Sequence, residues 1–271
     1  MNQQTGSMRP ISQMPDFEKR KINYVLTDID DTLTNNGRLT AEAFAALERL
    51  QAADKKIIPI TGRPAGWCDH FARMWPVDAL VGENGAFYFS YERREKKMTR
   101  RYWKTDQERL RDKVRLKNLE KEILTQVPGA AVSADQAFRE ADLAIDFCED
   151  VPPLSRDQIA KITECFKKAG AKAKISSIHV NGWFGDYDKL AMTRILFQEK
   201  YNLELSRTKE QILYIGDSPN DAPMFAFFKN SVGVANIKAF TTEIDTLPSW
   251  ITSKEGGYGF AEMVNVLLNT G

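Results

Sequence analysis

The sequence predicts an α/β protein with a Rossmann-like three-layer core around a parallel sheet, plus an inserted α+β cap domain. Two observations favour this fold class. Near both ends of the chain, short β-rich runs alternate with helix-like segments, which is typical of βαβ units. The middle of the chain instead has two strands around a charged turn, followed by capped helices and further strands, which indicates a separate module. A length of 271 residues accommodates one large domain or two modest ones.

The first part of the core is expected at residues 21–86, after a loose N-terminal leader at residues 1–20 that shows no hydrophobic period. A helix is expected to begin after Thr40, which is a suitable N-cap, with Phe44 and Leu47 on its buried face. Three strands are expected, at Lys21–Thr27, Ile57–Ile60 and Ala79–Val81.

The cap is expected at residues 87–183. A hairpin of Phe87–Glu92 and Met98–Trp103 opens it, and two capping boxes, which begin at Thr105 and Ser155, predict the starts of two helices. Two further strands are expected, at Ala141–Cys148 and Lys174–Val180. The core resumes at residues 184–271, where a helix at Lys189–Tyr201 precedes strands expected at Gln211–Ile215, Ser231–Val234 and Trp250–Thr252.

Composition and charge limit the function classes. The chain has 38 Lys and Arg against 37 Asp and Glu, a formal charge of +1, which argues against nucleic acid as a partner. No apolar run is long enough to span a membrane, and no signal peptide is visible. The 3 cysteines are too few for a disulfide framework, and the 2 histidines exclude a His-rich metal site. We therefore expect a cytoplasmic protein, a monomer or small homo-oligomer, with no membrane partner.

Polar clusters follow three of the expected strands directly. Asp28 and Asp30 follow the first strand, Thr61 follows the second, and Asp217 begins the cluster that contains Asp221 after the strand Gln211–Ile215. Because ligands bind at the carboxyl ends of parallel strands, these clusters are expected to meet in one crevice. A single aspartate after a strand is ordinary turn chemistry, but three clusters at three strand ends are seldom coincidence. Four carboxylates brought together favour a hard divalent cation, and Mg²⁺ suits carboxylates combined with a substrate phosphate.

These residues resemble the four motifs of the haloacid dehalogenase (HAD) superfamily. The motifs are Asp28-x-Asp30-x-Thr32, Thr61-Gly62-Arg63, Lys189 and Gly216-Asp217-Ser218-Pro219-Asn220-Asp221, in the family's order and spacing. The resemblance covers the chain from about residue 22 to its end. The large insert and the run Gly82–Ala86 are similar to the Cof-like branch, which includes sugar-phosphate phosphatases such as sucrose-phosphate phosphatase.

The resemblance implies a Mg²⁺-dependent phosphatase that acts on a small phosphorylated metabolite, most naturally a sugar phosphate. Asp28 would be the nucleophile that forms an aspartyl-phosphate, and Asp30 would be the general acid and base. The implied phosphate-binding residues are Thr61, Gly62, Lys189 and Asn220. The implied metal site consists of Asp28, the backbone carbonyl of Asp30, Asp217 and Asp221. The substrate-binding candidates are Glu83, Asn84, His179 and Asn181.

Two other functions remain open at the level of sequence. A phosphotransferase or phosphomutase of the same fold would pass the phosphoryl group to a sugar hydroxyl instead of water. A non-catalytic protein that binds a phosphorylated metabolite would need only the pocket, although the intact set of motif residues argues against it. Asp31, where relatives often carry glycine, is expected to be a turn residue, and Arg63 is expected to fix the loop after the second strand.

Overall fold

A six-stranded, fully parallel sheet forms the centre of the computed structural model, which describes residues 8–176 and 178–269. In order across the sheet the strands are β1 (Arg9–Pro10), β15 (Trp250–Ile251), β14 (Asn230–Gly233), β13 (Ile212–Gly216), β2 (Tyr24–Thr27) and β5 (Lys56–Pro59). Every residue of β13 is buried, which explains why this strand is a continuous apolar run with no alternation.

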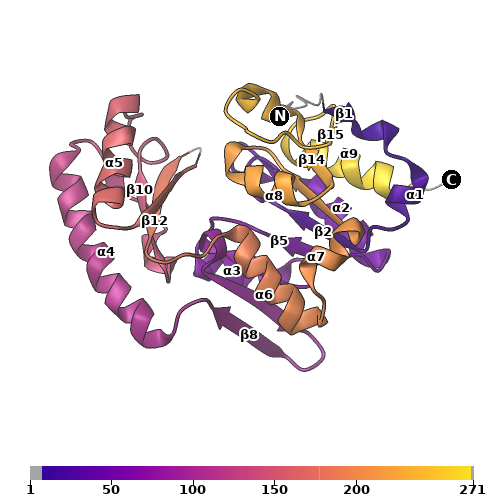
Figure 1. Ribbon diagram of the computed structural model, residues 1–271, viewed down its shortest axis with the longest axis horizontal. Coiled ribbons are helices and arrows are strands. Elements are labelled where there is room, and N and C mark those ends of the chain that lie inside the picture. Colours follow the sequence, from indigo (N-terminus) through magenta and orange to yellow (C-terminus); the bar gives the residue numbers. More distant parts are fainter. Residues whose placement is uncertain (1–7, 177, 270–271) are drawn as a thin grey trace.

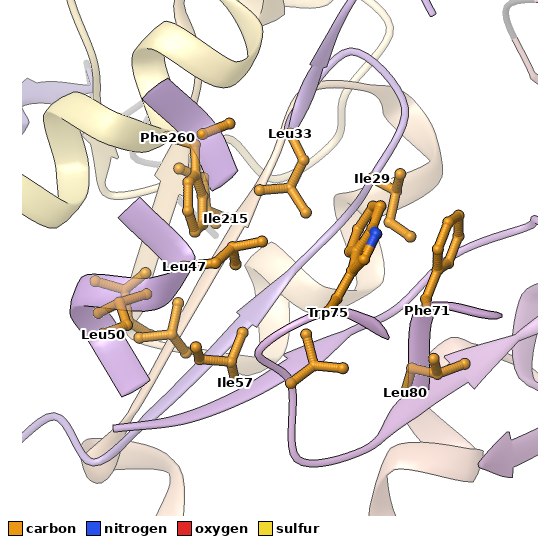
Figure 2. Packing of buried hydrophobic residues seen from close by; sticks show 14 of the residues in the cluster. Ile29, Leu33, Leu47, Leu50, Ile57, Phe71, Trp75, Leu80, Ile215 and Phe260 are labelled. Atoms are coloured by element: carbon orange, nitrogen blue, oxygen red, sulfur yellow. The ribbon is translucent and has the colours of Figure 1, made fainter. Parts of the chain in front are cut away.

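Helices cover both faces of the sheet, and this gives the three expected layers (Figure 1). One face packs against α2 (Ala41–Ala52), α3 (Ala65–Met74) and α9 (Gly256–Leu268). Figure 2 shows part of this layer, where Leu47, Ile57 and Phe260 pack together. The other face packs against α6 (Lys189–Tyr201), α7 (Leu205–Thr208) and α8 (Ala222–Phe227). Strand alternation sends Val25 to the first layer and Leu26 to the second.

A three-stranded antiparallel sheet extends the core. Its strands are β6 (Leu80–Gly82), β7 (Phe87–Glu92) and β8 (Lys97–Tyr102), and a parallel bridge from Ile60 to Val81 joins it to the end of β5. Phe87 and Phe89 belong to the same buried cluster as α2 and α9. The expected cap boundary between residues 86 and 87 therefore falls inside a continuous sheet. Backbone pairing and apolar burial tie this hairpin to the core, and we propose that the cap begins at Thr105.

The cap is a four-stranded antiparallel sheet with two helices packed on it (Figure 1). The sheet order is β11 (Lys172–Ile175), β12 (His179–Trp183), β10 (Asp142–Asp146) and β9 (Ala131–Val132). The helices are α4 (Asp106–Gln126) and α5 (Arg156–Lys168), and both predicted capping boxes are confirmed at their N-termini. The single strand expected at Lys174–Val180 is wrong, because the chain reverses there and β11 pairs antiparallel with β12.

The expectation of a loose leader is corrected from Arg9 onward, while residues 1–7 lie outside the described residues. β1 pairs with β15, and the Arg9 guanidinium lies 3.8 Å from the Trp250 ring centroid. Ile11 and Met14 are buried in the core cluster. The remaining elements are α1 (Asp16–Lys19), β3 (Thr34–Asn35), β4 (Arg38–Leu39) and short 3-10 turns at Ile11–Gln13, Glu83–Gly85, Gln136–Phe138, Lys209–Gln211, Pro219–Asp221 and Ala235–Phe240. Within residues 8–176 and 178–269, none of the helices has the length and apolar character that crossing a membrane requires.

Candidate active site

The three predicted polar clusters lie at one edge of the parallel sheet, where β2, β5 and β13 end. The register aligns Thr27 with both Pro59 and Ile215, so the residues that follow these strands are neighbours. A pocket of about 710 Å³ lies between this edge and the cap. Its lining includes most of the predicted site residues, namely Asp28, Asp30, Gly62, Asn84, His179, Asn181, Asp217 and Asn220. The other predicted residues, which are Thr61, Glu83, Lys189 and Asp221, are buried behind this lining.

Three buried aspartates form the acidic centre of the pocket. Carboxylate oxygens of Asp28, Asp217 and Asp221 all lie within 4.8 Å of one another. Burial raises the pKa of Asp28 to about 7, and burial together with the neighbouring Asp221 and Asp28 carboxylates raises the pKa of Asp217 well above its usual value. Neutral donors hold Asp217 in place, with Thr32 Oγ1 at 3.2 Å and Asn236 Nδ2 at 3.3 Å. Crowded carboxylates of this kind are stabilised by a bound cation.

Lys189 supplies one positive charge to this centre. Its Nζ lies 2.7 Å from Asp28 Oδ1 and 3.1 Å from Asp221 Oδ1. Burial alone would lower the pKa of Lys189, but Asp221 and Asp28 outweigh it and raise the pKa above its usual value. The lysine is the first residue of α6, whose N-cap is Asp188. A Cβ at Gly85 would lie 2.1 Å from the Asp188 carbonyl oxygen, so glycine there lets the start of α6 approach the sheet edge.

Both carboxylate oxygens of Asp221 accept hydrogen bonds. Its Oδ1 accepts from Lys189 Nζ and from the Tyr214 hydroxyl at 2.5 Å, and its Oδ2 accepts from the backbone N–H groups of Asp217 and Ser218. Burial opposes the charge, but Lys189 and Tyr214 outweigh it, so the pKa of Asp221 lies below its usual value. Asp221 therefore positions Lys189 and the loop after β13. Sequence reasoning missed Tyr214, and the only available signal was a tyrosine inside an otherwise apolar strand.

Asp30 is held by Arg63 in a two-pronged ion pair. Arg63 Nε lies 2.9 Å and 3.0 Å from the two carboxylate oxygens, and Nη2 lies 2.6 Å from Oδ1. The guanidinium also lies 4.5 Å from the Trp67 ring centroid. Arg63 thus orients the Asp30 side chain as well as contributing to its own loop, a pairing that the sequence did not predict. Asp31 has a φ of +57°, which explains why glycine suits this turn position.

Thr61 and Gly62 follow β5, with Gly62 in the pocket lining and Thr61 buried directly behind it. The Thr61 hydroxyl accepts from the Arg63 N–H at 3.0 Å, which leaves its own proton available to a ligand. The Gly62 carbonyl accepts from Arg139 Nη1 of the cap at 3.2 Å. Asn84 lines the pocket beside Gly62 and has a φ of +55°.

Glu83, predicted as a substrate residue, instead lies outside the pocket lining. Its carboxylate accepts from four backbone N–H groups, those of Ala65 in the core and of Glu140, Ala141 and Asp142 in the cap. Burial and the Asp142 carboxylate raise the pKa of Glu83 to about 8, against the opposing effect of Arg139 and these donors. The geometry therefore gives Glu83 a role in joining cap and core.

The cap contributes a polar roof from β11, β12 and the segment before β10. Asn181 Nδ2 donates to Asp142 Oδ2 at 3.0 Å, and His179 Nε2 lies 2.9 Å from Glu149 Oε2. Burial lowers the pKa of His179 below its usual value, and the nearby Arg139 acts in the same direction. Two basic residues on this roof, Arg139 and Lys174, were not singled out from the sequence as site residues. Nothing in their local sequence distinguishes them from other surface cations.

Comparisons with known proteins agree with this fold. The family model for haloacid dehalogenase-like hydrolases matches residues 25–179. The fold is similar to that of protein 0175 from Thermoplasma acidophilum (TM-score 0.69, 16% identity, covering 91% of this chain and 98% of that one). It is also similar to a protein described as a HAD/COF-like hydrolase from Plasmodium vivax (TM-score 0.68, 17% identity, 95% and 100% coverage). A trehalose-6-phosphate phosphatase related protein shares the fold as well (TM-score 0.59, 14% identity, 90% and 95% coverage). No curated protein matches the sequence significantly.

Proposed function

The chain belongs to the haloacid dehalogenase-like hydrolases, and from this membership we propose that it is a Mg²⁺-dependent phosphatase of small phosphorylated metabolites, with sugar phosphates as the preferred class. One observation carries the proposal. Asp28 lies at the end of β2 with its carboxylate 2.7 Å from a buried lysine, and Asp30, two residues later, lines the same pocket. A carboxylate nucleophile beside a separate acid and base is the arrangement that hydrolysis through a covalent intermediate requires.

In the proposed reaction, an oxygen of Asp28 attacks phosphorus, and the bond from phosphorus to the ester oxygen breaks. Asp30 donates a proton to the departing oxygen, so the alcohol leaves neutral and an aspartyl-phosphate remains on Asp28. Asp30 then accepts a proton from water, which attacks phosphorus, releases inorganic phosphate and restores the Asp28 carboxylate. Lys189 offsets phosphoryl charge, while Thr61, Gly62 and Asn220 would donate hydrogen bonds to the phosphoryl oxygens.

The donor set fits Mg²⁺, a hard cation that prefers oxygen ligands. Asp28 and Asp217 line the pocket, and their raised pKa values reflect burial together with repulsion from neighbouring carboxylates, which in the case of Asp28 outweigh the effect of Lys189. These two carboxylates and the Asp30 carbonyl would hold the ion. Asp221, whose oxygens already accept five hydrogen bonds, would support the site from behind. When bound, the ion would polarise the phosphoryl group and stabilise the charge that develops on it.

The preference for sugar phosphates is supported by neutral polar side chains in the lining of the pocket, from both core and cap. Asn84, His179 and Asn181 offer amide and imidazole groups that can hydrogen-bond hydroxyl groups. A volume of about 710 Å³ is ample for a small phosphorylated metabolite. The shared fold with a trehalose-6-phosphate phosphatase related protein is consistent with this class.

The test is release of inorganic phosphate with Mg²⁺ across a panel of phosphorylated sugars, polyols, nucleotides and glycerate derivatives. Asp28→Asn should abolish release. Asp31→Asn, at the turn residue directly after Asp30, should retain most of the phosphate release. Chelation should stop the reaction, and added Mg²⁺ should restore it. Transfer that depends on an acceptor sugar would favour the phosphotransferase, and binding without any turnover would favour the non-catalytic protein. Equal activity of the wild-type and Asp28→Asn proteins would refute the mechanism.

A further inference from the structure

The basic side chains that line the pocket differ in how they are neutralised. Among the described lining residues, the lysines and arginines are Arg63, Arg139 and Lys174. Arg63 is paired with Asp30, and Arg139 is paired with both Asp135 and Asp142. Lys174 forms no ion pair within the part of the chain that the structure describes. Its charge is therefore the one among these three that no carboxylate offsets at close range.

Lys174 instead contacts neutral oxygens across the pocket. It lies on β11 of the cap, and its Nζ donates to the backbone oxygen of Asn220 at 3.1 Å and to the Asn220 side-chain oxygen. Asn220 belongs to the core loop between Asp217 and Asp221. Burial, followed by repulsion from Lys189, lowers the pKa of Lys174 to about 8, so the side chain is still largely charged at neutral pH.

A partly buried ammonium with only neutral partners carries a cost in free energy, because amide oxygens replace only part of its hydration. The rest of the pocket lining is mostly acidic or neutral, which sets the ammonium of Lys174 apart. The acidic residues that line the pocket are Asp28, Asp30, Asp31, Asp217, Glu243 and Glu255. An anionic ligand that enters so acidic a pocket requires positive charge at its binding position. The ammonium of Lys174 is placed to supply it.

We propose that Lys174 is a specificity-determining residue that binds an anionic group of the substrate across the pocket, exchanging the neutral oxygens of Asn220 for anionic ones. This inference rests on the proposed phosphatase function. It adds that the cap selects substrates by an anionic group that Lys174 binds. The anionic group has two possible sources, the phosphoryl group that reacts or a second anionic substituent on the leaving group. Both require the charge of Lys174, whereas a contact that only fastens the cap to the core would require only its hydrogen bonds.

The variants separate charge from hydrogen bonding. Lys174→Gln keeps a donor toward Asn220 but removes the charge, and Lys174→Arg keeps the charge. The matched control is Lys172→Gln, because Lys172 lies on the same strand but pairs with the exposed Asp186 and does not line the pocket. Thermal unfolding of each variant reports whether the fold survives. If Lys174→Gln fails to fold, Lys174→Arg combined with the salt dependence of wild-type binding decides the role of charge.

The first arm is calorimetric binding of inorganic phosphate to each protein with Mg²⁺ present. If Lys174 binds the reacting phosphoryl group, Lys174→Gln should weaken phosphate binding about 10- to 100-fold, and Lys174→Arg should restore most of it. The second arm compares KM for matched esters, glucose 6-phosphate against 6-phosphogluconate and glycerol 3-phosphate against 3-phosphoglycerate. If Lys174 binds a second anionic group, Lys174→Gln should raise KM about 10- to 100-fold for the carboxylate-bearing member of each pair alone.

The proposal is overturned if Lys174→Gln changes neither phosphate binding nor any KM by more than about twofold, or if Lys172→Gln has the same effect as Lys174→Gln. A folded Lys174→Gln protein that loses only thermal stability would identify a cap fastening and would also overturn it. If the wild type hydrolyses none of the esters, the phosphatase function fails, yet the phosphate-binding arm still decides whether Lys174 binds anions. A wild type that neither hydrolyses esters nor binds phosphate would overturn both.

Discussion

Replacing Tyr214 by phenylalanine removes a single oxygen from beneath the candidate active site. The hydroxyl donates to Asp221 Oδ1 at 2.5 Å, and both residues are fully buried. The aromatic contacts survive the change, because the ring packs against Phe225 and Phe228 with centroid separations of 5.7 Å and 6.2 Å. The variant therefore tests one hydrogen bond and almost nothing else.

The expected loss in the free energy of unfolding depends on the acceptor of this hydrogen bond, which is the charged carboxylate of Asp221. A hydrogen bond to a charged group contributes about 1.5–3 kcal/mol, and Asp221 keeps its other four donors, so we expect a loss of about 2 kcal/mol in the free energy of unfolding. For a chain of this size that loss lowers Tm by about 4–8 °C. Because Asp221 also positions Lys189, a looser carboxylate should reduce kcat by up to about tenfold.

The assay is thermal unfolding together with phosphate release, and the control is Tyr88→Phe. Tyr88 also donates to a carboxylate, Glu199 Oε2 at 2.8 Å, but the Glu199 side chain is 39% exposed, so water can replace the lost donor. We expect the control to lose less than about 1 kcal/mol and to keep its kcat. Equal losses in the two variants, or an unchanged Tyr214→Phe protein, would refute the role given to this hydrogen bond.

Three further predictions concern the charged groups around the pocket. Burial and repulsion from Lys189 lower the pKa of Lys174 to about 8, although Asp221, Asp188 and Asp28 act in the opposite direction. A rise in pH above about 8 therefore removes the charge of Lys174, so kcat/KM for anionic esters should fall there in the wild type but not in Lys174→Arg. Above about pH 8, where Glu83 is ionised, Glu83→Gln should cost about 2 kcal/mol or more, since an amide cannot accept all four N–H bonds. Hydrogen exchange should then accelerate at residues 140–142, and unchanged exchange would remove Glu83 from the joint between cap and core. Arg63→Lys should lower kcat/KM about tenfold by breaking the paired contacts to Asp30, whereas Arg73→Lys, at an exposed pair, should leave it unchanged.

Local patterns predicted most of the fold because the forces behind them act over short stretches of chain. The capping boxes at Thr105 and Ser155 are confirmed, since each is complete within four residues. The parallel sheet was predictable from short apolar runs that alternate with helix-like segments. The hairpin of β11 and β12 was not, because the segment from Lys174 to Val180 contains no glycine or proline to mark the reversal.

The residues of the candidate site also fall into two groups, those that sequence motifs predicted and those that only the folded structure brings together. Asp28 and Lys189 are 161 residues apart, and family resemblance rather than local sequence predicted their proximity. Tyr214 and Lys174 belong to no motif that was considered, and only tertiary packing brings their polar atoms to Asp221 and Asn220. The burial of Glu83 beneath cap backbone donors likewise depends on how the cap docks, a property that no short window of sequence encodes.

The central claim is that Asp28 carries the phosphoryl group, and one rapid-mixing measurement tests it most directly. The Asp30→Asn protein is mixed with p-nitrophenyl phosphate, whose leaving group departs without a proton donor, so the first step survives while the hydrolysis step lacks its base. We predict a burst of about one nitrophenol per active site followed by a stall, with phosphate covalently attached to Asp28. Two results would contradict the account. One is the absence of a burst in the Asp30→Asn protein, and the other is a burst that persists in the double variant that carries both Asp28→Asn and Asp30→Asn.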